Sequence, residues 1–143
     1  KIHGGGSMKL RTFFVINAII MLCQGAYAML LPATVLSQYG VSNGPVESFM
    51  AQYAGLGTFV MGLLALFSRD ITDHKAQRAV ILTLLCANII GVFVSVLGLI
   101  SGVIGAIGWV VVVFYLFFAV GYAYFWFAMS RVPSSEMKPD SSQ

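Results

Sequence analysis

Four amide side chains stand within long apolar stretches of this sequence, where a polar group has few partners. Asn17 and Gln24 are seven residues apart, a spacing that puts both on one face of a helix. An amide in hydrocarbon raises the free energy unless it finds a hydrogen-bond partner, so all four should point inward, toward one another. Such groups can bond helices together or line a cavity that binds or passes a small neutral solute. With three hydroxyl-bearing residues they make up the candidate ligand-binding or pore-lining set: Asn17, Gln24, Gln52, Asn88, Ser95, Tyr115 and Tyr122.

The charged residues offer less chemistry. One connecting segment holds Asp70, Asp73 and His74, which could bind a metal ion or act on a lipid substrate. The simpler interpretation is that Asp73 caps the following helix while the other charges are solvated. Glu47 should lie in the first turn of a helix that begins at Pro45, where a carboxylate is favourable. No activated nucleophile, carboxylate pair or metal-ligand set is present, so we predict no catalytic residue, no metal site and no cofactor.

The two cysteines, Cys23 and Cys86, fall inside apolar stretches and belong to no C-x-x-C pair. This spacing gives no support to metal or redox chemistry. We expect both to be buried free thiols.

The elements that must position these residues follow from the apolar blocks. Only 9% of the 143 residues are charged and 59% are hydrophobic, whereas a soluble domain carries about 25% charged residues. Four blocks of roughly 20 residues or more can each cross a ~30 Å hydrocarbon core as a helix. Membrane-spanning strands would alternate in polarity, and no block does. The sequence predicts an all-α membrane protein with four transmembrane helices in an up-down-up-down bundle, at about 12–31, 45–67, 79–100 and 108–128.

The remaining segments and the orientation follow from charge. Residues 1–7 look like an added linker, 8–128 form the transmembrane domain, and 129–143 form a polar cytoplasmic tail. The first block could instead be a signal peptide cleaved after Ala26-Tyr27-Ala28, but its length and its two amides argue against this. Beyond the linker, every Lys and Arg precedes the first block, separates the second from the third, or follows the fourth. The positive-inside rule therefore places both termini in the cytoplasm.

Small residues recur at spacings of three and four on the second and third predicted helices. In lipid, such stripes let two helices approach closely. They should be packing seams, within this chain or against a second subunit, formed by Ala51, Gly55, Gly62, Gly91, Gly98 and Gly102. The fourth predicted helix is instead aromatic, and its rings could pack against other helices or line a pocket for a lipid or flat apolar ligand.

Several short motifs are similar to those of small bacterial four-helix integral membrane proteins. They are Leu31-Pro32, Tyr39-Gly40-Val41, Ser68-Arg69-Asp70-Ile71, Arg78-Ala79, Asn88-x-x-Gly91, and Gly108-Trp109 with Tyr115. Together they are spread over most of residues 8–127. The chain thus resembles a family for which no activity is known, and we expect it to lie in a bacterial inner membrane.

Three functions are compatible with these features. The favoured one is a non-enzymatic protein that acts through helix–helix association, as a homo-oligomer or an accessory subunit of a membrane complex. The second is a small passive transporter or channel for a neutral or apolar solute, because the predicted spans contain no Asp, Glu, Lys, Arg or His apart from Glu47. The third is a lipid-binding or lipid-modifying protein. The expected partners are the lipid bilayer and other membrane subunits, with no role for nucleic acid.

Overall fold

The computed structural model describes residues 4–130, and this part of the chain folds into five helices with no strand. In chain order the helices are α1 (Gly4–Leu30), α2 (Pro32–Tyr39), α3 (Pro45–Ser68), α4 (His74–Ile100) and α5 (Ile107–Ser130). All except α2 are long and apolar enough to cross a membrane, which confirms the prediction of an all-α chain with four such helices. Helix α1 begins inside the segment expected to be a linker. The expected polar tail lies outside the described residues from position 131 onward.

The starts of α3 and α4 follow from their local sequence. Gly44 is the N-cap of α3, Pro45 occupies its first turn, and Glu47 lies in the same turn, as predicted. A proline is tolerated there because the first N–H groups of a helix have no partner within the helix. Asp73 is the N-cap of α4, and its carboxylate accepts a hydrogen bond of 2.9 Å from the backbone N–H of Ala76. The predicted capping role of Asp73 is therefore confirmed.

Helix α2 occupies the connection between α1 and α3 and was not among the predicted helices. It begins at Pro32, immediately after α1 ends. It ends at Gly40, whose φ of 75° is left-handed and therefore suits glycine. The N–H of Gly40 bonds the carbonyl of Ser37 at 3.1 Å, and the N–H of Val41 bonds the carbonyl of Leu36 at 2.9 Å. The turn that follows returns the chain to the start of α3.

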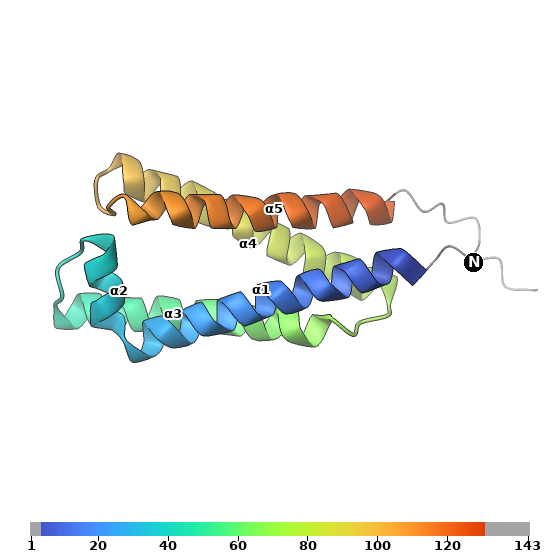
Figure 1. Cartoon of the computed structure of the whole chain (residues 1–143), viewed down its shortest axis with the longest axis horizontal. Helices are drawn as coiled ribbons and strands as arrows, with labels where there is room; N and C mark the ends of the chain where they lie inside the picture. The colour runs from blue at the N-terminus through green and yellow to red at the C-terminus, as the bar shows by residue number, and fades with distance from the viewer. Residues whose placement is uncertain (1–3, 131–143) are drawn as a thin grey trace, which may run out of the picture.

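The four long helices form two antiparallel pairs, α1 with α3 and α4 with α5 (Figure 1). Glycines set the close approach within the first pair. A Cβ atom on Gly25 would lie 2.8 Å from the carbonyl oxygen of Gly55 and 2.6 Å from the backbone nitrogen of Phe59. A Cβ atom on Gly62 would lie 2.9 Å from the backbone nitrogen of Leu22. These two helices therefore pack backbone against backbone.

The second pair is held by contacts between glycines and larger side chains. A Cβ atom on Gly91 would lie 2.8 Å from the ring of Tyr115, and one on Gly98 would lie 3.1 Å from Ile104. Gly102 lies past the end of α4, where its φ of 69° belongs to the turn toward α5. Although α3 and α4 follow each other in the chain, they contact each other far less than either contacts its pair partner.

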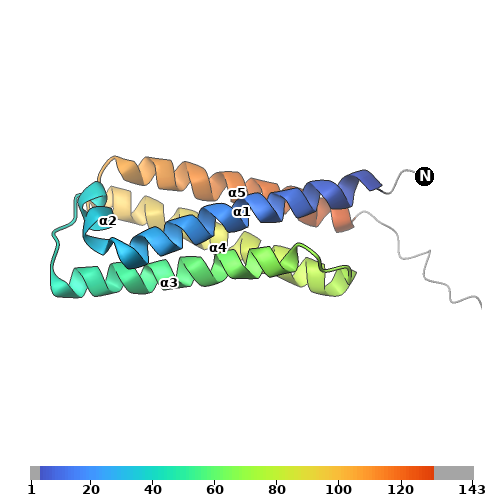
Figure 2. The same cartoon turned by 60° about the horizontal axis from the view of Figure 1, so that its bottom comes forward.

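The two pairs meet in a core at one end of the bundle, which holds the start of α1 and the end of α5. We call this end the terminal half and the opposite end the α2 half (Figure 2). Phe13 reaches from α1 to α5, with its ring centroid 5.1 Å from that of Tyr122 and 5.4 Å from that of Phe118. The buried residues of this core are Leu10, Phe14, Ala18, Ala65, Ile81, Leu84, Phe118 and Tyr122. Because this core lies in the terminal half alone, the pairs diverge toward α2 (Figure 1).

Both cysteines lie on the outer surface of the bundle as free thiols, so the expected burial of Cys23 and Cys86 is wrong. A thiol behaves as a small apolar group. It is therefore compatible with the exposed apolar surface that these helices present.

Candidate ligand-binding site

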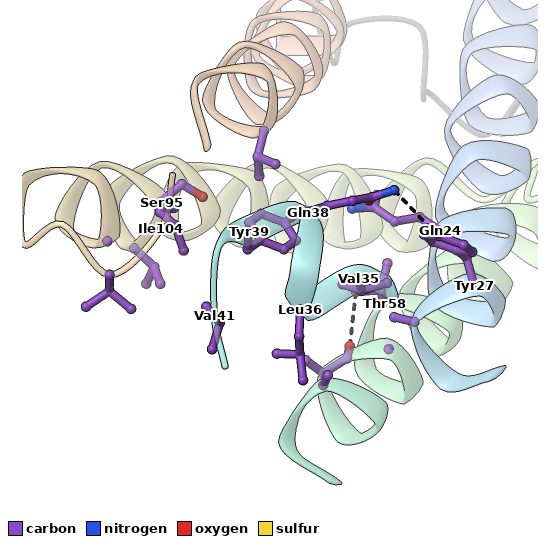
Figure 3. Close-up of a pocket in the computed structure, with 18 of the residues that line it drawn as sticks. Gln24, Tyr27, Val35, Leu36, Gln38, Tyr39, Val41, Thr58, Ser95 and Ile104 are labelled. Carbon is purple, nitrogen blue, oxygen red and sulfur yellow. Dashed lines mark hydrogen bonds between the residues drawn. The ribbon is translucent and has the colours of Figure 1, made fainter. Parts of the chain in front are cut away.

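A cavity of about 580 Å³ lies between the two helix pairs in the α2 half (Figure 3). All five helices contribute to its walls, and most of the lining side chains are apolar. Its volume falls within the range of ~300–1,000 Å³ that is usual for sites binding one small molecule. The cavity exists because the pairs that pack tightly in the terminal half diverge here.

Helix α2 closes one side of this cavity and is tied to both helix pairs. The side-chain amide of Gln38 donates a hydrogen bond of 3.0 Å to the hydroxyl of Tyr27 on α1. The N–H of Gly105, in the turn between α4 and α5, donates a bond of 2.9 Å to the carbonyl of Tyr39. These bonds let eight residues bridge the gap between the diverging pairs.

Neutral polar side chains face this apolar cavity. Gln24, Tyr39, Ser95 and Tyr115 line it, and none of these side chains makes a hydrogen bond within residues 4–130. Ser95 is the most buried of them, at 8% exposed. In the described part of the chain no wholly buried side-chain nitrogen or oxygen lacks a partner, so the Ser95 hydroxyl must be reachable from the cavity. A bound molecule with a hydroxyl or carbonyl group could satisfy these donors and acceptors.

The electrostatic character of the cavity is neutral. No Asp, Glu, Lys, Arg or His is among its lining residues. Burial raises the pKa of the Tyr39 phenol, with a smaller rise due to Tyr115, so this group stays uncharged at neutral pH. A charged ligand would find no countercharge here, and burying an unpaired charge is strongly unfavourable.

A second cavity, of about 230 Å³, lies deeper between α3 and α4. Ala54, Thr58 and Tyr115 line both cavities, so the two are adjacent. Asn88 lines the second cavity and is 3% exposed. Its Nδ2 donates a hydrogen bond of 2.7 Å to the carbonyl of Leu84 in its own helix.

The structure places the predicted site residues in several different regions. Gln24, Ser95 and Tyr115 line the first cavity, and Asn88 and Tyr115 line the second. Asn17 instead donates a 2.5 Å bond to the hydroxyl of Tyr122 within the fully buried core. Gln52 is exposed and donates a 3.1 Å bond to the carbonyl of Met29. The four amides therefore do not converge on one another.

Sequence reasoning missed the contribution of α2 and its neighbours to the cavity: Tyr27, Gln38, Tyr39 and Thr58. A detectable pattern exists in the sequence. A proline at position 32 followed eight residues later by Gly40 is a start-and-stop pair for a short helix. This pattern places Gln38 and Tyr39 on one short helix beside the first span.

The second cavity stops at the core of the terminal half. Met21 and Leu84 line the deeper cavity, and below it Phe14, Asn17 and Tyr122 are 0–1% exposed. We call the two cavities together the recess. It is closed on the side of the terminal half.

In the charged segment between α3 and α4, both aspartates make structural contacts. Asp70 forms ion pairs with Arg11 at 3.0 Å and with Arg69 at 3.1 Å, and Asp73 caps α4. Within residues 4–130 no group of three or more His, Cys, Asp and Glu side chains is placed to hold a metal ion.

No protein-family model, curated protein or solved structure matches this chain. Its function must therefore be inferred from the chemistry of the recess between the helix pairs.

Proposed function

We propose that this protein is a non-enzymatic integral membrane protein that binds one small, neutral, amphiphilic molecule in the recess between its helix pairs. The observation that carries this proposal is the Ser95 hydroxyl, which is nearly buried, has no partner among the described residues and faces an apolar cavity. An apolar pocket with a few convergent polar groups is the usual form of a small-molecule site. The apolar part of the ligand would pack against the helices while its polar group bonds Ser95, Tyr115 or Gln24.

Binding is better supported than passage. A channel or passive carrier needs a polar route across the whole membrane, whereas this recess ends at a packed aromatic core. Asn17 and Tyr122, the polar residues in that core, bond each other. The recess therefore favours a protein that retains its ligand.

The proposed setting is a bacterial inner membrane with both termini in the cytoplasm. All Lys and Arg of residues 9–130 lie at the end of the bundle where α1 starts, α3 ends and α4 begins, and residues 31–44 and 101–106 at the α2 end have none. In this orientation the positive-inside rule is satisfied. The first cavity then lies in the outer half of the bilayer.

The orientation is tested by labelling single cysteines in intact cells. In a background carrying Cys23→Ala and Cys86→Ala, the Asn43→Cys variant should react with a membrane-impermeant maleimide added outside. The Thr72→Cys variant should react only after the membrane is permeabilised, because its segment should face the cytoplasm. Labelling of Thr72→Cys alone in intact cells would reverse the orientation.

The ligand is tested by native mass spectrometry of protein purified from its membrane in mild detergent. The unmodified chain should carry a bound neutral molecule of constant mass. Ala54→Phe should reduce its retention by about tenfold or more, equivalent to ~1.4 kcal/mol, because position 54 lines both cavities.

The control is Val60→Phe on the same helix, where the side chain is 51% exposed and lines neither cavity. It should retain the molecule at the level of the unmodified chain. Absence of any bound molecule, or equal loss in both variants, would contradict a site between the helix pairs.

A further inference from the structure

We infer that the two cavities form one elongated site for a neutral molecule with a hydrogen-bonding group at each end of an apolar body. This inference rests on the proposed function, because it specifies the ligand of the same recess. It is carried by two buried polar side chains on α4, Ser95 and Asn88, each of which faces a different cavity.

The spacing of these residues sets the length of the site. Ser95 and Asn88 are seven residues apart, so they lie on one face of α4. At 1.5 Å per residue they are separated by about 10 Å along the helix axis. Midway between them is Gly91, on which the ring of Tyr115 packs. One hydroxyl and one amide thus mark the two ends of an aromatic-walled segment.

Both end groups have unused hydrogen-bonding capacity. Ser95 makes no side-chain hydrogen bond within residues 4–130. Asn88 makes one, from Nδ2 to Leu84, so its Oδ1 accepts none. Because no wholly buried side-chain polar atom in this part of the chain lacks a partner, this oxygen must be reachable from the second cavity. It offers an acceptor for a ligand hydroxyl.

The stretch between the end groups is mainly apolar, apart from the Tyr115 hydroxyl, which makes no hydrogen bond within residues 4–130. Ala54, Thr58 and Tyr115 line both cavities there. The Thr58 hydroxyl already donates a 3.1 Å bond to the carbonyl of Ala54, so its methyl group and the Tyr115 ring are left to contact a ligand. A lipid with a single polar head would place hydrocarbon against Asn88 and leave its amide oxygen unsatisfied, which is unfavourable. A molecule with a hydroxyl at each end satisfies both.

The lining also excludes ionic lipids from this site. Neither cavity has a Lys, Arg or His among its lining residues. A phosphate or carboxylate would therefore be buried without a countercharge. The chemical class is a neutral diol or a molecule of equivalent polarity at both ends.

Straight-chain α,ω-alkanediols and the 1-alkanols of the same chain lengths are the probes that test this inference. Their affinities for the purified protein in lipid nanodiscs would be measured by native mass spectrometry or calorimetry. The diol whose extended length matches about 10 Å should bind about tenfold more tightly than the 1-alkanol of equal length. Longer and shorter diols should lose this advantage.

Substitutions of Asn88 test whether this residue binds the second polar group of the ligand. Asn88→Leu should abolish the advantage of the diol, because it removes both the acceptor for the second hydroxyl and the unsatisfied amide oxygen that a 1-alkanol meets at this position. Asn88→Gln should move the optimum to a shorter diol, because its amide reaches farther into the cavity. The control is Thr83→Val on α4, where the exposed hydroxyl bonds the carbonyl of Ala79, and it should keep the original preference.

The outcomes separate this inference from the proposed function. If diols and 1-alkanols bind equally at every length, and Ala54→Phe weakens both, the elongated site is wrong and the proposed function stands. If the unmodified protein binds neither series, the proposed function itself fails. An Asn88→Gln variant with an unchanged optimum would also overturn the role of Asn88.

Discussion

Gly25→Leu should lower the free energy of unfolding by about 3 kcal/mol or more, since overpacking costs typically 1–3 kcal/mol and here meets main chain. A Cβ atom at position 25 would lie 2.6 Å from the backbone nitrogen of Phe59 and 2.8 Å from the carbonyl oxygen of Gly55. Neither atom can move without separating α1 from α3. Unfolding of the purified protein in mixed micelles, followed by circular dichroism as denaturing detergent is added, measures the change.

The matched control is Gly57→Leu on α3. A Cβ atom at position 57 would have no heavy atom within 4 Å, so the new side chain meets open space. Replacing a helical glycine also removes a helix-propensity penalty of up to ~1 kcal/mol. The stability of this variant should be unchanged or increased. Equal destabilisation of the two variants would contradict the close contact of α1 and α3.

The sequence predicts some of the glycines that lie between helices but not Gly25. Gly55 and Gly62 were predicted to lie in a packing seam because small residues recur on their helix, and both do face α1. Gly25 was not among the predicted packing residues, although Ala28 follows it three residues later and also lies against Gly55. The importance of Gly25 depends on which helix crosses α3 at that height, and the hydrophobic pattern of a single helix does not contain that information.

The amides do not meet because they lie at different heights along the helix axes. A spacing of seven residues correctly places Asn17 and Gln24 on one face, but it also separates them by about 10 Å along α1. Asn17 therefore reaches the buried core, where it bonds Tyr122, while Gln24 lines the first cavity. Periodicity predicts the direction of a side chain, whereas its partner depends on its height in the bundle.

The four long helices could be predicted because each is an apolar block of sufficient length, a property that belongs to the segment alone. The recess could not, because it arises from the uneven placement of large side chains. Aromatic residues fill the space between the pairs in the terminal half. In the α2 half that space is bordered by small or slender residues such as Ala54, Gly98 and Ser95.

Association with a second subunit stays a prediction, and the packing limits how it could occur. Gly55 and Gly62 are covered by α1, and Gly91 by Tyr115 of α5. Gly98 lies against Ile104 in the turn between α4 and α5. A homo-oligomer or complex would therefore use other surfaces, such as the exposed apolar side chains of α3 and α4. The small-residue seams contribute to the fold of the single chain.

Phe118→Ala should lower the free energy of unfolding by about 3–5 kcal/mol, the usual cost of truncating a buried aromatic ring. Phe118 is 1% exposed, and its ring lies 5.4 Å from that of Phe13 and 4.9 Å from that of Phe114, centroid to centroid. The contact with Phe13 connects α5 to α1, so its loss weakens the one region where the two helix pairs are packed together. The same unfolding titration in mixed micelles measures the change.

Phe117→Ala is the control, because the neighbouring residue on α5 is 63% exposed. Its ring lies farther from that of Phe13, at 6.4 Å between centroids, and most of it faces outward. Lipid or detergent therefore replaces most of what the truncation removes, and the expected loss is about 1 kcal/mol or less. Comparable losses at positions 117 and 118 would mean that α5 is rotated from the orientation described. That rotation would carry Tyr122 out of the core and Tyr115 out of the recess, so the pair of variants tests the site together with the fold.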